Sequence, residues 1–403
     1  MITVKQAQAL LIDSLSCQQP TEVIAVDNAL GRVVTQDIVS SIMIPPNDNS
    51  AMDGFAINSA DLQGFDNQKT LVVSQRIPAG AVAEPLETGT AARIFTGGMM
   101  PSGADAVVIQ ENCDYDSNDK VTIKKAVVSQ ENVRPAGQDI PVGKVVVTKG
   151  QRLNAIDLSL MTAVGIASVE VYKPLKVAVF STGDELAEPG DVLKPGQIYN
   201  SNRTFLIALC QQLGFEAVDI GTVADTIDAT KEALDKASVS ADFILSSGGV
   251  SVGDEDHVKP AVEALGSLEL WKVQMKPGKP VAYGQIKGVP FLGLPGNPVS
   301  SFVVFQLLVV PALRALQGQT VQLPRSFPVQ AGFSKKVTSR EEYIRAQLHK
   351  EPDGGWIATP YENSSSGVLS SLSWAHGLVR QEIDQEIQQG DSLAYFALHD
   401  GLL

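Results

Sequence analysis

Strand-like and helix-like patterns alternate along the second half of the chain. Amphipathic segments predict helices over Asn202–Leu213 and Thr226–Lys236, and Ser300–Leu316 predicts a long apolar helix that Pro311 interrupts. Strands that alternate with helices predict βαβ units and a parallel sheet. The loops after such strands gather at one edge of the sheet, where ligands usually bind. The apolar runs that predict these strands are Lys176–Phe180, Ala217–Val223, Ala241–Leu245 and Val289–Leu294.

The N-terminal part of the chain shows shorter patterns. Apolar positions at helical spacing predict a helix over Thr3–Ser16, and alternating runs predict strands over Thr21–Val26 and Ile166–Tyr172. The residues between these strands are rich in glycine, proline and β-branched types, with many short alternating runs. That texture predicts a β-rich domain inserted into a discontinuous one. Short runs beyond Gly318 predict a further small β domain.

Together these patterns predict a multidomain α/β protein. Its centre is a doubly wound, mostly parallel α/β domain, accompanied by an inserted β-rich domain, an elongated discontinuous α+β domain and a small C-terminal β domain. A length of 403 residues is ample for several cores. The expected boundaries are 1–41 with 141–172 for the elongated domain, 42–140 for the insertion, 173–320 for the central domain and 321–403 for the last.

Composition and charge exclude several classes of function. The formal net charge is −14, so general binding to nucleic acid or to an anionic lipid surface is not expected, because both reward a basic field. No apolar run reaches the ~18 residues of a membrane helix, and the N-terminus lacks the layout of a secretory signal, which favours the cytoplasm. Three cysteines and four histidines lie scattered, without disulfide or zinc-site spacing.

One loop at the expected edge of the sheet has the composition of an anion site. The segment Ser246–Gly253 follows a predicted strand and holds three glycines and three serines. Glycines with positive φ let successive N–H groups turn inward and form a nest for an anion. The alternative is a tight β-to-α turn without a ligand. The density of glycine and serine favours binding of a phosphate or another oxyanion.

Acidic residues cluster at the same expected edge. The segment Asp254–Asp256 follows the glycine-rich loop, Asp184 and Glu185 lie on a neighbouring loop, and Asp225 lies on a third. Each acid alone could be a solvated residue at a helix start. Several carboxylates beside an anion repel one another unless a cation intervenes, and Mg²⁺ takes one or two carboxylates together with phosphate oxygens. Their convergence therefore predicts a Mg²⁺ site.

Positive charge is concentrated in the short segment 272–279, which holds three lysines. In a strand Lys272 and Lys276 would point the same way, and the Pro-Gly turn would return Lys279 towards them. An exposed hairpin face is the alternative, but three ammonium groups on one turn favour an oxyanion clamp. The loop Pro295–Pro298 opens a predicted helix whose free N–H groups suit a further anion. The residues thus predict Mg²⁺-assisted chemistry on a phosphorylated or polyanionic small molecule.

Eight strings spread over most of the chain resemble those of one protein family, in the family's order. This family is the MoeA family of molybdopterin molybdenumtransferases, to which the E domain of gephyrin is related. The strings are Asn49–Ala56, Phe95–Gly98, Pro101–Val108, Arg134–Asp139, Ser181–Leu186, Ser247–Gly253, Lys276–Pro280 and Leu294–Pro298.

The resemblance implies a fold and a reaction. The fold is an elongated homodimer whose central domain is like molybdopterin adenylyltransferase, with an active site completed by the partner subunit. The reaction takes adenylylated molybdopterin and molybdate, inserts molybdenum and releases AMP in the presence of Mg²⁺, with transient contacts to other cofactor-synthesis proteins. Two alternatives stay open: a molybdopterin adenylyltransferase, and a gephyrin-like scaffold, which the lack of a long disordered linker disfavours.

The resemblance also implies roles for individual residues. Glu185, Asp225 and Asp256 would serve the metal. Two departures from the family are Phe55, where tyrosine is usual, and Ser365–Val368, where the family often has Ser-Ser-Arg. The second departure leaves open the last domain's share in oxyanion binding. The remaining implied residues are Asp53, Thr96, Lys272, Lys276 and Lys279 for catalysis, and Arg134, Ser247, Gly248, Gly249, Ser251, Pro295, Gly296, Asn297, Pro298, Arg345, Ser366 and Ser371 for substrate binding.

Overall fold

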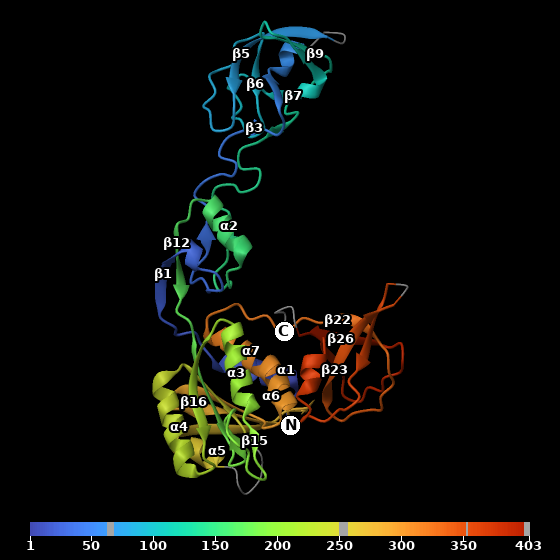
Figure 1. Cartoon of the computed structure of the whole chain (residues 1–403). Helices are drawn as coiled ribbons and strands as arrows, with labels where there is room; N and C mark the ends of the chain where they lie inside the picture. The colour runs from blue at the N-terminus through green and yellow to red at the C-terminus, as the bar shows by residue number, and fades with distance from the viewer. Residues whose placement is uncertain (63–67, 250–256, 352–353, 399–403) are drawn as a thin grey trace.

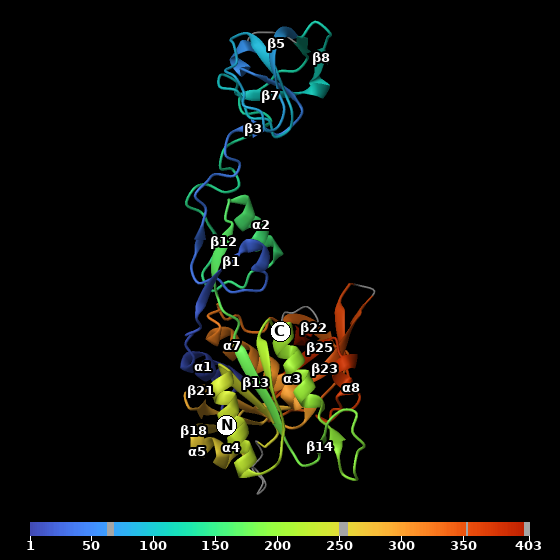
Figure 2. The ribbon, with the colours of Figure 1, turned by 60° about the vertical axis from the view of Figure 1, so that its left-hand side comes forward.

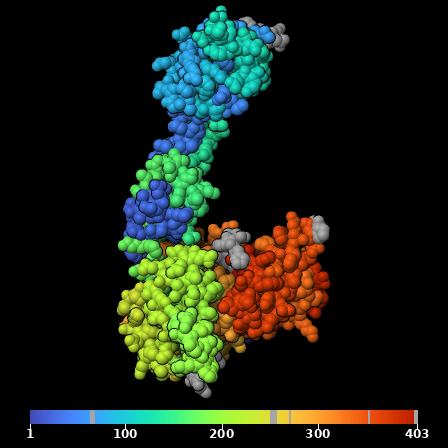
Figure 3. All heavy atoms as spheres, viewed as in Figure 1, coloured from blue at the N-terminus to red at the C-terminus, as the bar shows by residue number. Residues whose placement is uncertain are grey.

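The chain forms an extended molecule. The computed structural model describes residues 1–62, 68–249, 257–351 and 354–398. An inserted β domain lies at one end, and a slender domain joins it to the central α/β domain (Figure 1, Figure 2). The C-terminal domain lies beside the central one, and a narrow waist separates both from the inserted domain (Figure 3).

The central sheet confirms the four predicted parallel strands. It runs in the order β16-β13-β17-β21-β20-β18, and its first four strands are parallel neighbours. Strands β20 and β18 continue the sheet in antiparallel pairing. The bounds are β13 (Lys176–Thr182), β16 (Glu216–Val223), β17 (Phe243–Ser247), β18 (Gly266–Lys272), β20 (Pro280–Ile286) and β21 (Val289–Leu294).

Helices cover both faces of this sheet, as a doubly wound fold requires. Alternate strand residues enter two different cores: Val177 and Val179 pack on one side, whereas Ala178 and Phe180 pack on the other. The first core also holds α1 (Val4–Ser14), α3 (Ser201–Gln212), α6 (Pro298–Val304) and α7 (Val310–Leu316), and the second holds α4 (Ile227–Ser240) and α5 (Val258–Leu265).

The long apolar helix differs from its predicted form. Its irregularity lies before Pro311, as a π-helical turn over Phe305–Val309 (η4) between α6 and α7. Proline has no N–H for the carbonyl four residues earlier, that of Leu307. The Gln8 side-chain amide donates to this carbonyl at 2.9 Å instead. Contrary to the expectation from the sequence, the helix Pro298–Leu316 is long and apolar enough to cross a membrane, but 89% of its apolar window is buried in the fold, as expected of a core helix.

Helix α1 lies in the central domain. Thr3 and Gln6 form a capping box at its N-terminus. Its apolar residues Val4, Ala7 and Leu11 enter the same core as α6 and α7. The stretch 1–41, which the sequence pattern assigned to the elongated domain, therefore contributes its first helix to another core, because periodicity reveals an apolar face but not its partner.

The elongated domain forms from two distant stretches. Strand β1 (Thr21–Ala25) pairs antiparallel with β12 (Ser168–Tyr172), and β2 (Ile38–Val39) pairs with β11 (Val145–Val147). Helix α2 (Ala155–Ala163) packs on them, capped by Asn154. The inserted domain between these stretches has a six-stranded sheet in the order β7-β4-β6-β5-β9-β8, and the short strands β3 (Asn49–Ser50) and β10 (Val133–Arg134) pair separately. The strands of the six-stranded sheet are β4 (Gly54–Ile57), β5 (Lys69–Ile77), β6 (Thr90–Ile94), β7 (Ala106–Ile109), β8 (Cys113–Tyr115) and β9 (Lys120–Ile123).

The C-terminal domain is a closed β-barrel. Its order is β23-β24-β22-β26-β25, and a further pairing of β23 with β25 closes the ring. A short strand of the central domain, β19 (Met275–Lys276), adds to β23 outside the ring, so the two domains share a sheet. The bounds are β22 (Phe327–Ala331), β23 (Glu341–Lys350), β24 (Trp356–Pro360), β25 (Gly377–Gln381) and β26 (Ser392–Ala397).

The three cysteines are free thiols, and two of them are expected to be inert. Burial raises the pKa of Cys113 to about 11 and that of Cys210 to about 12. The thiolate is the reactive form, so both stay protonated at pH 8. A thiol titration with a disulfide reagent at pH 8 should modify Cys17 at most in the native protein, and all three in urea. Rapid native modification of Cys210 would contradict this burial.

Candidate functional site

A cleft of about 380 Å³ lies at the predicted edge of the central sheet. The loops after β13, β17 and β21 line it, together with the start of α3 and a loop of the C-terminal barrel. It is therefore built where the carboxyl ends of parallel strands meet. The lining residues are Ser181, Thr182, Glu185, Leu186, Ile198, Tyr199, Asn200, Ser201, Asn202, Ser247, Gly248, Gly296, Asn297, Pro298, Gly367 and Leu369.

Two asparagines at the start of α3 join the loops of the cleft. Asn200 is the N-cap, accepting from the Arg203 N–H and donating to Thr222 Oγ1 at 2.8 Å. The Asn202 side-chain amide donates to Ser247 Oγ at 2.8 Å and to the Gly296 carbonyl at 2.7 Å. Asn202 thus bridges the loops after β17 and β21 and sets their spacing.

The glycine-rich loop packs closely on the loop after β13. A Cβ added at Gly248 would lie 2.8 Å from the Thr182 carbonyl, and one at Gly249 would lie 2.4 Å from Val258 Cγ2. Both residues have positive φ, +95° and +65°, so glycine is required. The Gly248 N–H donates to the Leu294 carbonyl at 3.0 Å, so it is not available to the predicted nest. Ser251 lies outside the described residues.

Buried hydroxyl groups lie beneath this loop. Within the described part of the chain, the side-chain oxygens of Ser181, Thr182 and Ser246 have no hydrogen-bond partner. Ser181 and Thr182 also line the cleft. A buried hydroxyl without a partner is costly, so these two can serve a ligand that brings its own donors or acceptors.

A loop of the C-terminal barrel docks onto the cleft. The Ser366 carbonyl accepts from the Val299 N–H in the first turn of α6, at 3.1 Å. Gly367 and Leu369 then line the cleft. The barrel therefore closes one side of a site whose other sides belong to the central domain.

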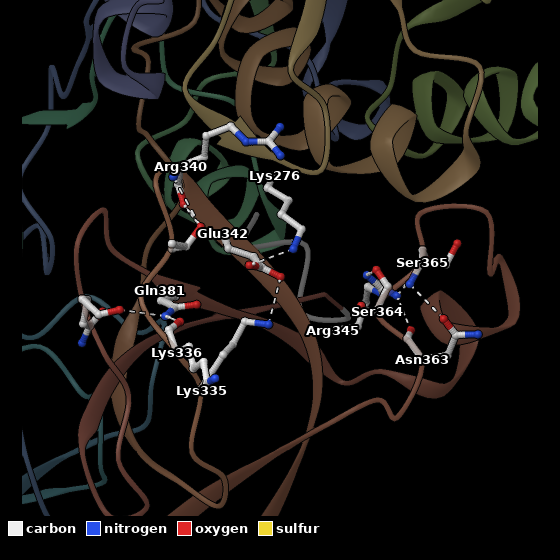
Figure 4. Close-up of polar contacts among 12 residues, drawn as sticks. Lys276, Lys335, Lys336, Arg340, Glu342, Arg345, Asn363, Ser364, Ser365 and Gln381 are labelled. Atoms are coloured by element: carbon white, nitrogen blue, oxygen red, sulfur yellow. Dashed lines mark hydrogen bonds and ion pairs between the residues drawn. The ribbon is translucent and has the colours of Figure 1, made fainter.

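Arg345 holds this loop from within the barrel. Its guanidinium donates to the carbonyls of Asn363 at 2.8 Å, Ser364 at 3.4 Å and Ser365 at 3.0 Å (Figure 4). It also donates to Ser371 Oγ at 3.0 Å. Burial lowers the pKa of Arg345. Arg345 and Ser371, two of the three barrel residues that the resemblance assigned to substrate, thus use these groups inside their own domain and position the loop.

The acidic residues gather in part. Glu185 lines the cleft, and its carboxylate folds back over Gly183, where a Cβ would lie 2.5 Å from Glu185 Oε2. On the neighbouring loops the Asp225 N–H donates to Asp184 Oδ1 at 3.1 Å. No group of three potential metal ligands occurs within residues 1–62, 68–249, 257–351 and 354–398. Asp256, the third predicted metal ligand, lies outside these ranges.

The three lysines of the predicted clamp differ in their surroundings. Lys276 Nζ lies 3.3 Å from Glu342 Oε2, and Lys335 Nζ lies 3.3 Å from the other oxygen of the same carboxylate (Figure 4). Lys272 and Lys279 are exposed beside the turn, which the Val273 N–H closes by donating to the Lys279 carbonyl. The predicted turn exists, but the described lining of the cleft contains neither lysine nor arginine.

The remaining predicted residues lie in the inserted domain, far from this cleft in the same chain (Figure 1). The Thr96 N–H and hydroxyl both donate to Asp53 Oδ1 at 2.8 Å. These bonds and the nearby Arg93 lower the pKa of Asp53. Arg134 is exposed and pairs with Asn49 across a short ladder. Three of the family-like strings thus meet here, on a second surface.

Comparison with known proteins identifies the family. The MoeA N-terminal region (domain I and II) matches residues 2–165, a "Probable molybdopterin binding domain" matches 178–315, and the MoeA C-terminal region (domain IV) matches 330–398. The molybdopterin molybdenumtransferase of Haemophilus influenzae is 40% identical over 357 residues, covering 88% of each chain.

The chain belongs to the MoeA family. It is a molybdopterin molybdenumtransferase, an enzyme of molybdenum cofactor biosynthesis. The relatives therefore support this function over the adenylyltransferase and the scaffold that the sequence left open. The Nostoc molybdopterin molybdenumtransferase is 39% identical over 378 residues, covering 91% of this chain and 86% of the relative. A molybdopterin biosynthesis MoeA structure from Pyrococcus horikoshii superposes with a TM-score of 0.86 at 29% identity, covering 99% and 100%.

Sequence reasoning missed part of the cleft of this MoeA chain. Ser181, Thr182, Tyr199, Asn200 and Asn202 line it, yet none was predicted as a site residue. A signal for the asparagines was present, because Asn-Ser-Asn stands where a helix starts after a strand and loop. For the two hydroxyls the signal was weak, since they end a buried strand.

Proposed function

We propose that this MoeA-family enzyme binds adenylylated molybdopterin in the cleft at the edge of the central sheet, inserts molybdenum from molybdate and releases AMP. The observation that carries the proposal is the cleft itself, closed by the barrel loop that docks on α6 through Ser366 and Val299. A volume of about 380 Å³ suits part of a small polar ligand.

The chemistry of the lining supports a pterin or nucleotide. Leu186, Ile198 and Leu369 offer apolar surface to a flat ring, while Asn297 and the hydroxyl of Thr182 offer polar groups to its edge. Few such groups, placed around an apolar surface, are typical of small-molecule sites. We assign Pro295–Pro298 and Ser247–Gly249 to the phosphate side of the substrate.

We propose Mg²⁺ as the counter-charge for the phosphates. The described lining offers a carboxylate, Glu185, and no cationic side chain, which suits a divalent ion that arrives with phosphate oxygens. Glu185 and Asp225 are the candidates to hold it, with Asp256 a third. When bound, Mg²⁺ would neutralise charge that develops on the leaving phosphate.

Lys276 is our candidate for the molybdate side, with Lys272 and Lys279 in support. Its ammonium lies at the junction of the central domain and the barrel, where the Glu342 carboxylate orients it. The Glu342 side chain is only 6% exposed and also pairs with Lys335. This arrangement holds two ammonium groups around one acid, so a net positive charge is left to attract an oxyanion.

We further propose a homodimer, in which the Asp53 and Thr96 surface of one chain completes the cleft of the other. Within one chain these residues lie at the opposite end of the molecule (Figure 2). Large apolar side chains are exposed along the connecting region, as a subunit interface requires: Val39, Ile42, Met43, Val142 and Val145. Transient contacts with other cofactor-synthesis proteins and a cytoplasmic location complete the proposal.

Replacing Asn202 with alanine should lower AMP release about a hundredfold with the fold intact. The substitution removes the bridge between the Ser247 and Gly296 loops, and small displacements of positioning groups reduce rates by this order. The measurement is AMP formed from adenylylated molybdopterin, molybdate and Mg²⁺.

Gln211→Ala is the matched control, since Gln211 is exposed near the other end of the same helix. Equal rates for the two variants would argue against this cleft. AMP release by neither variant nor wild type, with ATP consumed on free molybdopterin, would indicate an adenylyltransferase instead.

A further inference from the structure

A second cleft of about 400 Å³ lies away from the proposed active site, where the elongated domain meets the end of α7 and the linker to the barrel. Among the residues that the structure describes, its lining contains three arginines, from three separate segments, and no carboxylate. The lining residues are Thr148, Gly150, Gln151, Arg152, Asn154, Arg314, Gln319, Thr320, Gln322, Leu323 and Arg325.

The hydrogen-bond acceptors of the three guanidinium groups are neutral oxygens among the described residues. Arg152 Nε donates to the Gly31 carbonyl at 3.1 Å. Arg314 donates to the Gln322 carbonyl at 3.3 Å, and Arg325 donates to the Gln322 side-chain oxygen at 2.9 Å. None of the three forms an ion pair with any described residue. A guanidinium has five N–H donors, so several remain for a ligand.

The nearest acid on α2 does not neutralise these charges. Asp157 is buried, and its carboxylate accepts from the Asn154 N–H at 2.8 Å and from the Gln151 amide at 2.8 Å. Burial lowers the pKa of both Arg152 and Arg314, and the positive charge of Arg152 lowers that of Arg314 further. The two positive charges therefore lie close together in partly desolvated surroundings, and a bound anion would offset their mutual repulsion.

The backbone leaves room for Arg152 at the domain junction. Gly31 belongs to the elongated domain and Gly214 follows α3 of the central domain, with φ of +76° and +86°. A Cβ at Gly31 would lie 3.2 Å from Arg152 Nη2, and a Cβ at Gly214 would lie 3.0 Å from the same atom. The guanidinium thus occupies a space that two glycines keep open between the domains, beside the cleft that Arg152 also lines.

We infer that this cleft binds a small phosphate-bearing anion, either an inorganic diphosphate or a nucleotide. The planar fork of arginine matches phosphate oxygens in pairs, and three such forks around one cleft suit a polyanion. The volume is that of a small-molecule site. In a chain of net charge −14, three arginines with no acid in the described lining of the cleft mark a local anion site. The inference does not depend on the proposed function.

The test is calorimetric titration of the full-length protein with inorganic pyrophosphate and, separately, with AMP. Arg314→Gln/Arg325→Gln is the site variant, because Arg152 also supports the domain junction. Lys120→Gln/Lys236→Gln removes equal charge from exposed positions elsewhere. We expect the site variant to lower the affinity for the anion at this cleft about a hundredfold, which is about tenfold for each arginine. The control should leave that affinity unchanged. The preferred probe identifies the ligand as diphosphate or nucleotide.

Three outcomes would overturn the inference: unchanged affinity in the site variant, equal weakening in both variants, or loss of subunit association in place of anion binding. Sedimentation of both variants checks the last of these. AMP release from adenylylated molybdopterin should stay within twofold of wild type in both variants, because neither alters the active-site cleft. A failure here is therefore distinct from a failure of the proposed function.

Discussion

Replacing Arg345 with lysine should reduce AMP release about a hundredfold and leave the barrel folded. The guanidinium holds three successive carbonyls, those of Asn363, Ser364 and Ser365, together with Ser371 Oγ. A lysine has a single ammonium group and cannot reproduce this fork. Carbonyls left without donors would let the loop move away from the Val299 N–H, and the cleft would open on its barrel side.

Arg380→Lys is the matched control for this prediction. Arg380 belongs to the same barrel, but its side chain is half-buried and pairs with the exposed Glu382 carboxylate at 3.0 Å, away from the loop that docks on the cleft. Circular dichroism establishes that both variants are folded, and steady-state assays compare their rates. We expect Arg380→Lys to stay close to wild type. If Arg345→Lys does so as well, the barrel loop is not needed for the reaction.

Leu11→Ala should lower the free energy of unfolding of the central domain by about 2–5 kcal/mol, the usual effect of truncating a buried leucine. Leu11 is fully buried in the core shared with α6 and α7. The cavity would form where α1 meets the π-helical turn that Gln8 also contacts. Urea unfolding measures the change in midpoint and slope.

The neighbouring residue provides the control. Leu10 is 50% exposed on the other face of the same helix, so Leu10→Ala should change stability by no more than about 0.5 kcal/mol. The pair separates core packing from helix propensity, because both substitutions place the same residue in the same helix. Equal effects would mean that α1 does not contribute to the central core in solution.

The central domain could be predicted well because its signals are local. Val289–Leu294 was predicted with the bounds that the structure has, and the parallel strands meet at the expected edge. The glycine-rich loop after β17 was also predicted from its composition. The structure explains the glycines, because only glycine fits the φ values there and the close approach to Thr182.

The candidate site was predicted less completely, because its geometry depends on long-range packing. Asn202 looked like an ordinary helix start, yet it bridges two loops. The resemblance assigned Arg345 to substrate, and the structure adds that its guanidinium donates to carbonyls of its own domain. Lys276 was predicted beside Lys272, yet it lies on a strand of the barrel sheet and pairs with Glu342. In each case the sequence identifies the functional group but not its partner.

By itself the sequence determined the elements, the alternation that makes a parallel sheet, the glycine positions and the family. These follow from short-range periodicity, steric limits on φ and strings of residues that occur together. Only the tertiary structure decided that α1 enters the central core, that the barrel loop closes the cleft, and that the inserted domain, to which Asp53 and Thr96 belong, lies at the far end of the molecule from the central domain. Those facts depend on which surfaces bury one another, and the pattern along one segment carries no information about the segment that will cover it.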